Sequence, residues 1–261
     1  MKTIGIIPAR MGASRFPGKP LAPMLGMPMV GHCFHRTRLA PGLDTACVTT
    51  CDEAIAEYVQ SIGGKAVMTS STHDRATTRT AEALEIIERE TGEKIDVVVM
   101  VQGDEPLISP EIIGETLKHF SDPAVEICNV ISKLRTLEAF TDKNNVKVVV
   151  DQNNDALYFS REPIPSPWKG WEQLPRYMQT GIIAFRRDVL LRFNAMQETL
   201  LEQYESVDMN RVLETGGRIR MVPTDAFTIG VDTPAELAEA ERHLRNDPTL
   251  SRYLKTEIYK G

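Results

Sequence analysis

TIGIIPARMGASRFPGKP, residues 3–20, is the stretch that decides the fold of this chain. Its first six residues are mostly apolar and predict a short buried strand. The residues that follow form a loop with two glycines, two prolines and three cations, Arg10, Arg15 and Lys19. A buried strand opening onto a glycine-broken basic loop presents backbone N–H groups and cations to a polyphosphate. Neither a P-loop motif nor a dinucleotide-binding G-x-G-x-x-G motif is present, so neither standard site is supported.

Strands and helices alternate through the first hundred residues. The run Asp96-Val97-Val98-Val99-Met100-Val101 has no polar alternation, which is typical of a parallel strand covered on both faces. This βαβαβα order predicts an α/β fold with a Rossmann-like, doubly wound, mostly parallel sheet. The other predicted strands are 3–8, 45–50 and 66–68, and the predicted helices are 29–39, 52–62 and 78–89.

The second half of the chain has a different pattern. Two apolar runs, 146–150 and 156–159, flank a polar turn and predict a β-hairpin. A proline-rich loop follows at 163–175, and no repeat or flexible linker divides the chain. We therefore predict one domain, residues 1–261, with an embedded β-rich segment at about 128–165. Further predicted elements are strands at 180–185 and 218–222 and helices at 189–196, 206–214 and 235–245.

Composition limits the classes of function. The chain has 261 residues and a net charge of −6, so binding to nucleic acid through bulk electrostatics is not expected. No apolar run reaches the roughly 20 residues that span a bilayer, and the N-terminus has no signal-peptide pattern. The four cysteines form no C-x-x-C pair. These features predict a cytoplasmic enzyme with reduced thiols and no membrane insertion.

Two aspartates are candidate metal ligands. Asp104 follows a central strand within Gln102-Gly103-Asp104-Glu105-Pro106, at the edge where open α/β sheets bind ligands. Near a triphosphate such a carboxylate often binds Mg²⁺, although an isolated Asp is as readily a turn residue or a helix cap. Asp232 lies in Gly230-Val231-Asp232-Thr233-Pro234, which also fits a helix start. Sequence spacing leaves open whether the two side chains converge.

The loop from Ala9 to Leu21, followed in order by the segments around Asp104 and Asp232, forms a characteristic set of motifs. Through this set the chain resembles the CMP-Kdo synthetase family, the 3-deoxy-manno-octulosonate cytidylyltransferases. The resemblance implies a fold of the nucleotide-diphospho-sugar transferase type and a homodimer formed through the β-rich segment. It implies Mg²⁺-dependent transfer of CMP from CTP to the anomeric hydroxyl of a 3-deoxy-ulosonic acid (Kdo or a close variant), with release of pyrophosphate and a place in lipopolysaccharide biosynthesis. The matching blocks, in order, are Ala9–Leu21, Val101–Pro106, Asn144–Val149, Ala156–Arg161, Gly181-Ile182 and Gly230–Pro234.

The same resemblance implies roles for individual residues. Catalytic roles fall to Lys19, Arg15, Asp104 and Asp232, of which Asp104 and Asp232 would bind Mg²⁺. The nucleotide-binding residues would be Ala9, Arg10, Ser14, Arg15, Lys19, His73, Thr77, Arg79 and Gln102. The sugar-binding residues would be Arg161, Gln179, Phe185, Asp208 and Met209.

Several positions depart from the family's motifs. The family's H-x-S-G-[ST]-[DE]-R becomes His73-Asp74-Arg75-Ala76-Thr77-Thr78-Arg79, so a Ser and a Gly beside the nucleotide are now Arg75 and Ala76. In the inferred sugar pocket, Gln179 replaces a His, Asp208 a Glu and Met209 a Gln. The acceptor is therefore Kdo, an amino or deoxy variant of it, or another acid such as a nonulosonic acid.

Other interpretations stay open. The chain is alternatively a homologue that binds a nucleotide without turning it over, although the loss of Asp104 or Asp232 that would favour this is not seen. A uridylyl- or guanylyltransferase would usually open with G-x-G-x-R, which this loop lacks. The β-rich segment either forms the dimer interface or covers the chain's own sheet. Glu202 and Glu205 either face an amino-substituted substrate or form an exposed acidic helix start.

Overall fold

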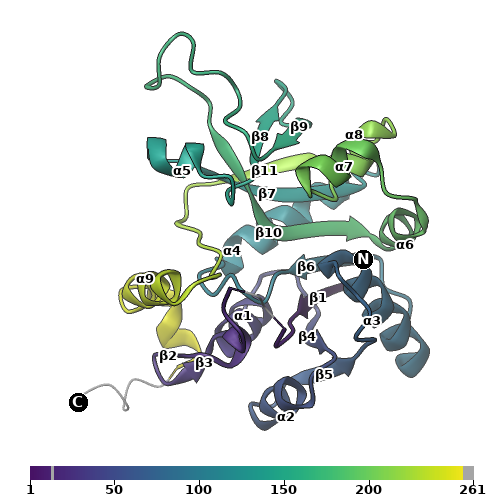
Figure 1. Ribbon diagram of the computed structural model, residues 1–261. Coiled ribbons are helices and arrows are strands. Elements are labelled where there is room, and N and C mark those ends of the chain that lie inside the picture. Colours follow the sequence, from purple (N-terminus) through teal and green to yellow (C-terminus); the bar gives the residue numbers. More distant parts are fainter. Residues whose placement is uncertain (13–14, 255–261) are drawn as a thin grey trace.

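A single nine-stranded sheet runs through the whole molecule (Figure 1). The computed structural model describes residues 1–12 and 15–254. Seven strands form the main path, in the order β11-β7-β10-β6-β1-β4-β5, while β8 pairs with β10 and β9 pairs with β8. The strands are β1 Thr3–Pro8, β4 Thr45–Thr50, β5 Lys65–Met68, β6 Val97–Val101, β7 Ile127–Lys133, β8 Lys147–Val150, β9 Ala156–Ser160, β10 Tyr177–Arg186 and β11 Arg220–Thr224.

The parallel part of the sheet lies where the sequence predicts it. β1 pairs in parallel with β4 and β6, β4 pairs in parallel with β5, and β11 pairs in parallel with β7. β10 lies between β6 and β7 and is antiparallel to both. The predicted α/β fold with a mostly parallel sheet is confirmed. β7 was not predicted as a separate strand, although it begins the predicted β-rich segment, and its seven residues lie between β10 and β11.

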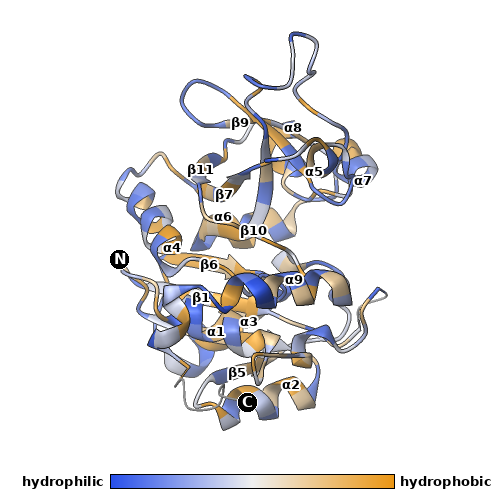
Figure 2. Cartoon of the chain, turned by 90° about the vertical axis from the view of Figure 1, so that its left-hand side faces the viewer, coloured by the Kyte–Doolittle hydropathy of each residue, from blue (hydrophilic) through white to orange (hydrophobic). Residues whose placement is uncertain are grey.

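Helices cover both faces of the sheet because its strands alternate between two apolar cores. Ile4, Ile6 and Val98 face the core beneath α3 and α6, whereas Ile7 and Val99 face the core beneath α1, α2 and α4. Figure 2 shows the resulting hydrophobic strands between amphipathic helices. The helices are α1 Met29–Arg38, α2 Glu53–Ser61, α3 Ala76–Thr91, α4 Pro110–Lys118, α5 Leu137–Thr141, α6 Arg187–Ala195, α7 Leu200–Glu205, α8 Asn210–Glu214 and α9 Pro234–Leu244.

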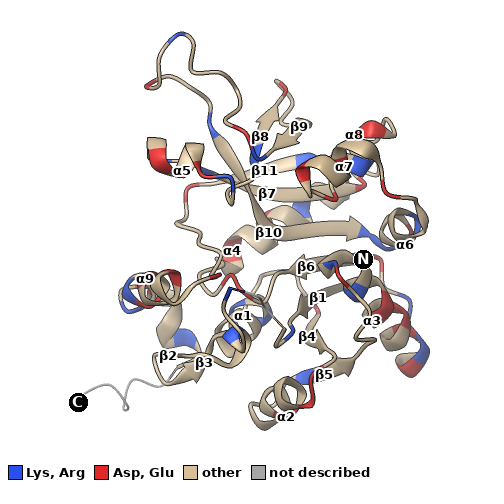
Figure 3. Ribbon diagram, viewed as in Figure 1, with Lys and Arg blue, Asp and Glu red and all other residues tan. Residues whose placement is uncertain are grey.

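Smaller elements complete the fold around α9. A short β-ribbon, β2 Pro23–Met24 and β3 Met27–Pro28, packs with α9 in a third apolar cluster. The 3₁₀ turns are η1 Lys19–Leu21, η2 His119–Ser121 and η3 Pro248–Arg252. Within the described residues, no helix has the length and apolarity needed to cross a membrane. Figure 3 shows Lys and Arg interspersed with Asp and Glu on the helices and loops, whereas the strands are largely without charge.

The predicted helix at 206–214 is wrong at its start. Ser206 has a φ of 52°, in the left-handed region, and ends α7 there, so the next helix, α8, begins only at Asn210. A left-handed residue breaks the run of α-helical hydrogen bonds, and Ser206 is one of few residues other than glycine in this conformation here. The reversal places residues 206–208 in a loop that faces the site described below.

The predicted hairpin is β8–β9, and its inner face is covered by the chain itself. Val148 and Phe159 are fully buried, and the Asn210 side chain of α8 hydrogen-bonds both the N–H and the carbonyl of Phe159. The hairpin extends the main sheet because β8 pairs with β10 at Tyr177 and Met178. On the outer side, Leu157 is 60% exposed.

Candidate active site

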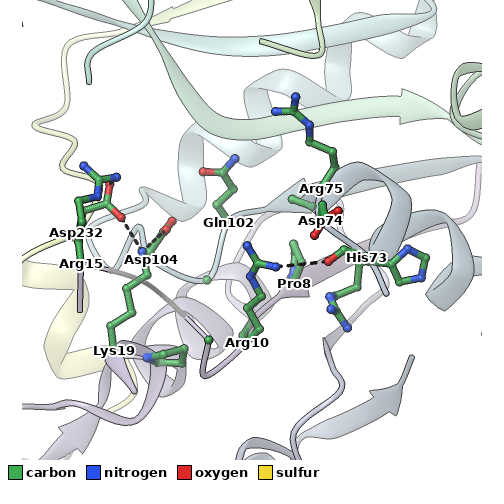
Figure 4. Close-up of a pocket in the computed structure, with 16 residues that line it drawn as sticks. Pro8, Arg10, Arg15, Lys19, His73, Asp74, Arg75, Gln102, Asp104 and Asp232 are labelled. Carbon is green, nitrogen blue, oxygen red and sulfur yellow. Dashed lines mark hydrogen bonds and ion pairs between the residues drawn. The ribbon is translucent and has the colours of Figure 1, made fainter. Parts of the chain in front are cut away.

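The predicted nucleotide site is a cavity of about 340 Å³ beside the carboxyl ends of the parallel strands β1 and β6 (Figure 4). The cavity is lined by the loop after β1, the residues after β5 and the residues after β6. These segments are far apart in sequence and meet at one edge of the sheet, which is where open α/β sheets bind their ligands. The sequence-predicted residues that line it are Ala9, Arg10, Arg15, Lys19, His73, Arg79, Gln102, Asp104 and Asp232. Ser14 lies outside the described residues.

The loop after β1 is held in place by its own backbone and by Asp52. Gly18 has a φ of 76°, a conformation that favours glycine, and its N–H donates to the Met11 carbonyl at 3.0 Å. The Met11 N–H in turn donates to Oδ2 of Asp52 at 2.8 Å, so Asp52 anchors this loop instead of capping α2. The 3₁₀ turn that starts directly after Gly18 places Lys19 inside the cavity.

Lys19 joins the two candidate metal ligands. Its Nζ lies 2.7 Å from Oδ2 of Asp104, 2.9 Å from Oδ1 of Asp232 and 2.9 Å from the carbonyl of Val231. Burial lowers the pKa of Lys19, but the two carboxylates outweigh it and raise the pKa above its ordinary value. The ammonium is therefore charged, and all three of its N–H donors have acceptors. We call Lys19, Asp104 and Asp232 the charge node.

Convergence of Asp104 and Asp232, which spacing left open, is thus established. Asp232 does not cap α9: Thr233 holds that position, accepting a hydrogen bond from the Glu236 N–H, and Pro234 is the first helical residue. The Asp232 side chain is free to face Asp104 and also pairs with Nη2 of Arg15 at 2.6 Å. Arg15 additionally donates to Oδ1 of Asn144, which links the loop to the β-rich segment.

The charge node suits a Mg²⁺ ion that shares its coordination with a substrate. In residues 1–12 and 15–254, no cluster of three or more His, Cys, Asp or Glu side chains forms a complete protein cage for a metal. Mg²⁺ commonly takes only one or two carboxylates and completes its octahedron with water and phosphate oxygens. Asp104 and Asp232 provide that donor set.

The other predicted nucleotide-binding residues differ in the hydrogen bonds that their side chains make within the protein. Arg10 is exposed in the cavity and makes one long contact, 3.4 Å from Nη1 to the His73 carbonyl. Arg79 is buried and donates to Oγ1 of Thr69 at 2.7 Å. Thr77 does not line the cavity, because its hydroxyl donates to Oδ2 of Asp208 at 2.9 Å. Arg10 is therefore free to bind phosphate, while Thr77 positions Asp208.

A second cavity, of about 370 Å³, opens from the first. The two share Asp74, Arg75, Ala76, Gln102, Asp104 and Asp232. The second cavity extends under β10 and the α7–α8 loop, where Arg161, Gln179 and Asp208 line it as predicted for the sugar site. Burial raises the pKa of Asp208, while the Thr77 hydroxyl and the Arg75 charge oppose the rise.

Two predicted sugar-binding residues lie elsewhere. Phe185 is fully buried at the far end of β10, opposite Val98, with its ring 6.2 Å from that of Phe193. It lies six positions along the strand from Gln179, a distance of about 20 Å. Met209 is also fully buried in the same core. Neither side chain lines the second cavity, so the interpretation of both as sugar contacts is corrected to core residues.

The acidic pair on α7 is structural. Glu202 is fully buried and makes a two-pronged ion pair with Nε and Nη2 of Arg211, both at 2.6 Å. Glu205 accepts hydrogen bonds from Ser160, Tyr158 and the backbone of Arg161. The expected exposed acidic helix start is wrong for Glu202, since the pair with Arg211 is what permits its burial.

Glu105 is a site residue that the sequence reasoning missed. It is 7% exposed and lines the second cavity, its Oε1 accepts the Gly181 N–H, and its Oε2 has no partner among the described residues. Burial raises the pKa of Glu105 to about 7, and the negative charge of Asp104 adds to the rise. The hydrogen bond from the Gly181 N–H acts in the opposite direction and lowers the pKa. Its position directly after Asp104 in Gln102-Gly103-Asp104-Glu105-Pro106 could have identified it, but only Asp104 of this motif was predicted as a site residue.

Gly181 brings the two cavities into contact. A Cβ at this position would lie 2.7 Å from Cβ of Gln102, which is closer than side chains tolerate. The Gln102 N–H donates to the Gly181 carbonyl at 3.0 Å, so β10 meets the end of β6 directly at the boundary between the cavities.

Comparison with known proteins identifies the family of this chain. A family model described as "Cytidylyltransferase" matches residues 4–219. The chain belongs to the cytidylyltransferase family. A 3-deoxy-manno-octulosonate cytidylyltransferase of Geobacter metallireducens is 42% identical over 91% of this chain and 95% of its own length. One of Geotalea uraniireducens is 41% identical over 94% of this chain and 100% of its own length.

A solved structure extends the likeness to three dimensions. It is a CMP:2-keto-3-deoxy-manno-octonic acid synthetase complexed with CTP, with a TM-score of 0.85 at 36% identity, covering 94% of this chain and 99% of that chain. The resemblance to the CMP-Kdo synthetase family is therefore confirmed. As a member of the cytidylyltransferase family, the chain is a nucleotidyltransferase.

Proposed function

We propose that this enzyme transfers CMP from CTP to the anomeric hydroxyl of a 3-deoxy-ulosonic acid, 3-deoxy-manno-octulosonate or a close variant, and releases pyrophosphate. The observation that carries the proposal is the position of the charge node, which lies at the boundary between a cavity with a basic loop and a second cavity beneath β10. A triphosphate bound in the first cavity would present its α-phosphorus to an acceptor hydroxyl bound in the second.

Positioning and charge neutralisation provide the catalysis. The acceptor oxygen attacks the α-phosphorus in line and pyrophosphate leaves, so the protein forms no covalent intermediate. Arg10, Arg15 and Lys19 would neutralise the triphosphate and the leaving pyrophosphate, since all three line the first cavity. Ser14 is proposed to assist from the same loop, and His73, Arg79 and Gln102 to border the nucleoside.

Mg²⁺ is the proposed cofactor, bound by Asp104 and Asp232. When bound there, it would supply charge neutralisation on the phosphate oxygens and polarise the acceptor hydroxyl. Because Lys19 now bridges both carboxylates, its ammonium has to move away as metal and nucleotide enter. Its flexible four-carbon stem allows that movement toward the β- and γ-phosphates.

We further propose a cytoplasmic homodimer whose product enters lipopolysaccharide synthesis. Two apolar side chains of the β-rich segment, Leu137 and Leu157, are 51% and 60% exposed, which suits a contact with a second copy.

Pyrophosphate release tests the proposed function. The enzyme is assayed with Mg²⁺ and either CTP or UTP, across Kdo, 8-amino-Kdo and a nonulosonic acid. We expect CTP-dependent release with at least one acid, falling by about 100-fold or more in Asp104→Asn and Asp232→Asn. Equal turnover with UTP, or full activity in both variants, would overturn the proposal.

A further inference from the structure

The second cavity needs a cation if it is to bind an acid. Among the described residues that line it, the carboxylates outnumber the cations, of which there are two, Arg75 and Arg161. A substrate carboxylate entering this acidic surface pays a large desolvation penalty unless an opposite charge meets it. The carboxylates are Asp74, Asp104, Glu105, Asp142, Asp208, Asp232 and Glu236.

Arg161 is largely committed to the protein. Its Nε donates to the Glu205 carbonyl at 2.7 Å, its Nη1 to the Lys143 carbonyl at 2.9 Å and its Nη2 to the Ser206 carbonyl at 3.4 Å. These bonds tie β9 to the end of α7 and fix the guanidinium by three of its five N–H donors. Moving it onto a substrate would leave those carbonyls without their donor.

Arg75 has no such commitment. Among the described residues its guanidinium makes one hydrogen bond, from Nη1 to Oγ of the exposed Ser206 at 3.5 Å, the limit of a hydrogen bond. Asp208, whose Oδ2 accepts from Thr77, forms no ion pair with Arg75 among the described residues, although the Arg75 charge counters the rise in the pKa of Asp208. Figure 4 shows Arg75 directed away from Arg10. Ser206, the partner of its guanidinium, lines the second cavity but not the first.

Local backbone structure adds to the positive potential around Arg75. Arg75 is the N-cap of α3, a 16-residue helix whose first turn contains no acidic residue and receives no side-chain cap. The helix N-terminus, with its partial positive charge, therefore lies at the junction of the two cavities with Arg75 and Ala76. A planar guanidinium suits a carboxylate, which it can bind through two parallel hydrogen bonds.

We propose that Arg75 determines acceptor specificity by pairing with the carboxylate of the sugar acid. The inference rests on the proposed function and replaces the role expected for Arg161, which instead positions the α7–α8 loop. It also assigns a purpose to the most conspicuous departure in the motif His73–Arg79, where the family has a serine.

A cycle of enzyme and substrate changes tests the pairing. Wild type and Arg75→Ser are compared with an accepted sugar acid and with the amide made from its carboxylate. We expect wild type to prefer the acid by about tenfold or more in kcat/KM, as for a charge-assisted pair, and Arg75→Ser to lose that preference with an unchanged KM for CTP. Arg75→Lys, which keeps the charge, should keep part of the preference.

Arg10→Ser is the matched control, because Arg10 lines only the first cavity. It should lower kcat/KM for acid and amide by the same factor. If Arg75→Ser also lowers both equally, or changes neither, the pairing is wrong although the proposed function stands. If wild type turns over no acid at all, the proposed function itself fails, and the two failures are thereby distinguished.

Discussion

At the scale of single residues, Lys19 acts as an internal cation. Its Nζ neutralises two carboxylates that would otherwise repel each other across a partly buried site, with an exposure of 11% for the Lys19 side chain. A divalent ion has to displace this ammonium, so nucleotide phosphates that accept Lys19 should favour metal binding. Metal and nucleotide binding are then coupled through one side chain.

Lys19→Met should therefore bind a divalent ion more tightly when no nucleotide is present. Removing the ammonium leaves Asp104 and Asp232 unneutralised, and we expect the Kd for Mn²⁺, measured by titration calorimetry, to fall by about tenfold. Transfer activity should fall at the same time, because the leaving pyrophosphate loses one of the three cations proposed to neutralise it. Lys169→Met, in an exposed loop, is the control and should change neither quantity. Unchanged or weaker Mn²⁺ binding in Lys19→Met would contradict the displacement.

Site residues were predicted correctly where a sequence motif determines both the place of a side chain in the fold and its chemical role. The motifs around Lys19, Asp104 and Asp232 predicted a shared site, and the structure brings these side chains together. Phe185 and Met209 failed because a motif letter does not say which face of a strand or helix a side chain takes. Both were assigned to the sugar pocket, yet both are fully buried in the core.

At the scale of elements, α1 is tied to its neighbours by a buried histidine. Nε2 of His32 lies 2.7 Å from the Met24 carbonyl, which can only accept, so Nε2 carries the proton. Nδ1 then accepts from the Tyr253 hydroxyl at 2.9 Å. Burial lowers the pKa of His32 to about 4, and the ring is neutral in the folded protein.

This histidine predicts a specific loss of stability in acid. The unfolded chain takes up the proton near pH 6.5 but the folded chain only near pH 4, so the contribution is complete above pH 6.5 and is lost as pH falls toward 4. His32→Gln keeps a donor and an acceptor but does not titrate. We expect the wild-type free energy of unfolding to drop by about 3 kcal/mol more than that of the variant between pH 7.5 and 4, measured by urea titration. If the free energy of unfolding falls equally with pH in wild type and His32→Gln, His32 does not contribute to the loss of stability in acid.

Element prediction was limited by long-range pairing and by backbone reversals. The apolar runs at β1, β4 and β6 predicted buried parallel strands, and in the structure β1 pairs in parallel with both β4 and β6. No local pattern predicts that β10 inserts antiparallel between β6 and β7, since that depends on pairing with residues over forty positions away. The left-handed turn at Ser206 was equally invisible, because serine rarely adopts it.

At the scale of the whole molecule, one sheet carries both cavities. The parallel strands β1 and β6 support the basic loop and Asp104, while antiparallel β10 supports Gln179 and Gly181 of the second cavity. Their contact at Gln102 and Gly181 sets the separation of the two cavities, and the charge node lies at that boundary. The account therefore predicts attack at the α-phosphorus rather than at the γ-phosphorus.

The measurement that tests this most directly is ³¹P NMR of the enzyme with CTP, Mg²⁺ and an accepted sugar acid. The account predicts one new phosphodiester resonance from a CMP-sugar and an equal amount of pyrophosphate, both absent from Asp104→Asn. Formation of CDP with a sugar phosphate or inorganic phosphate, or consumption of CTP without a phosphodiester, would contradict it.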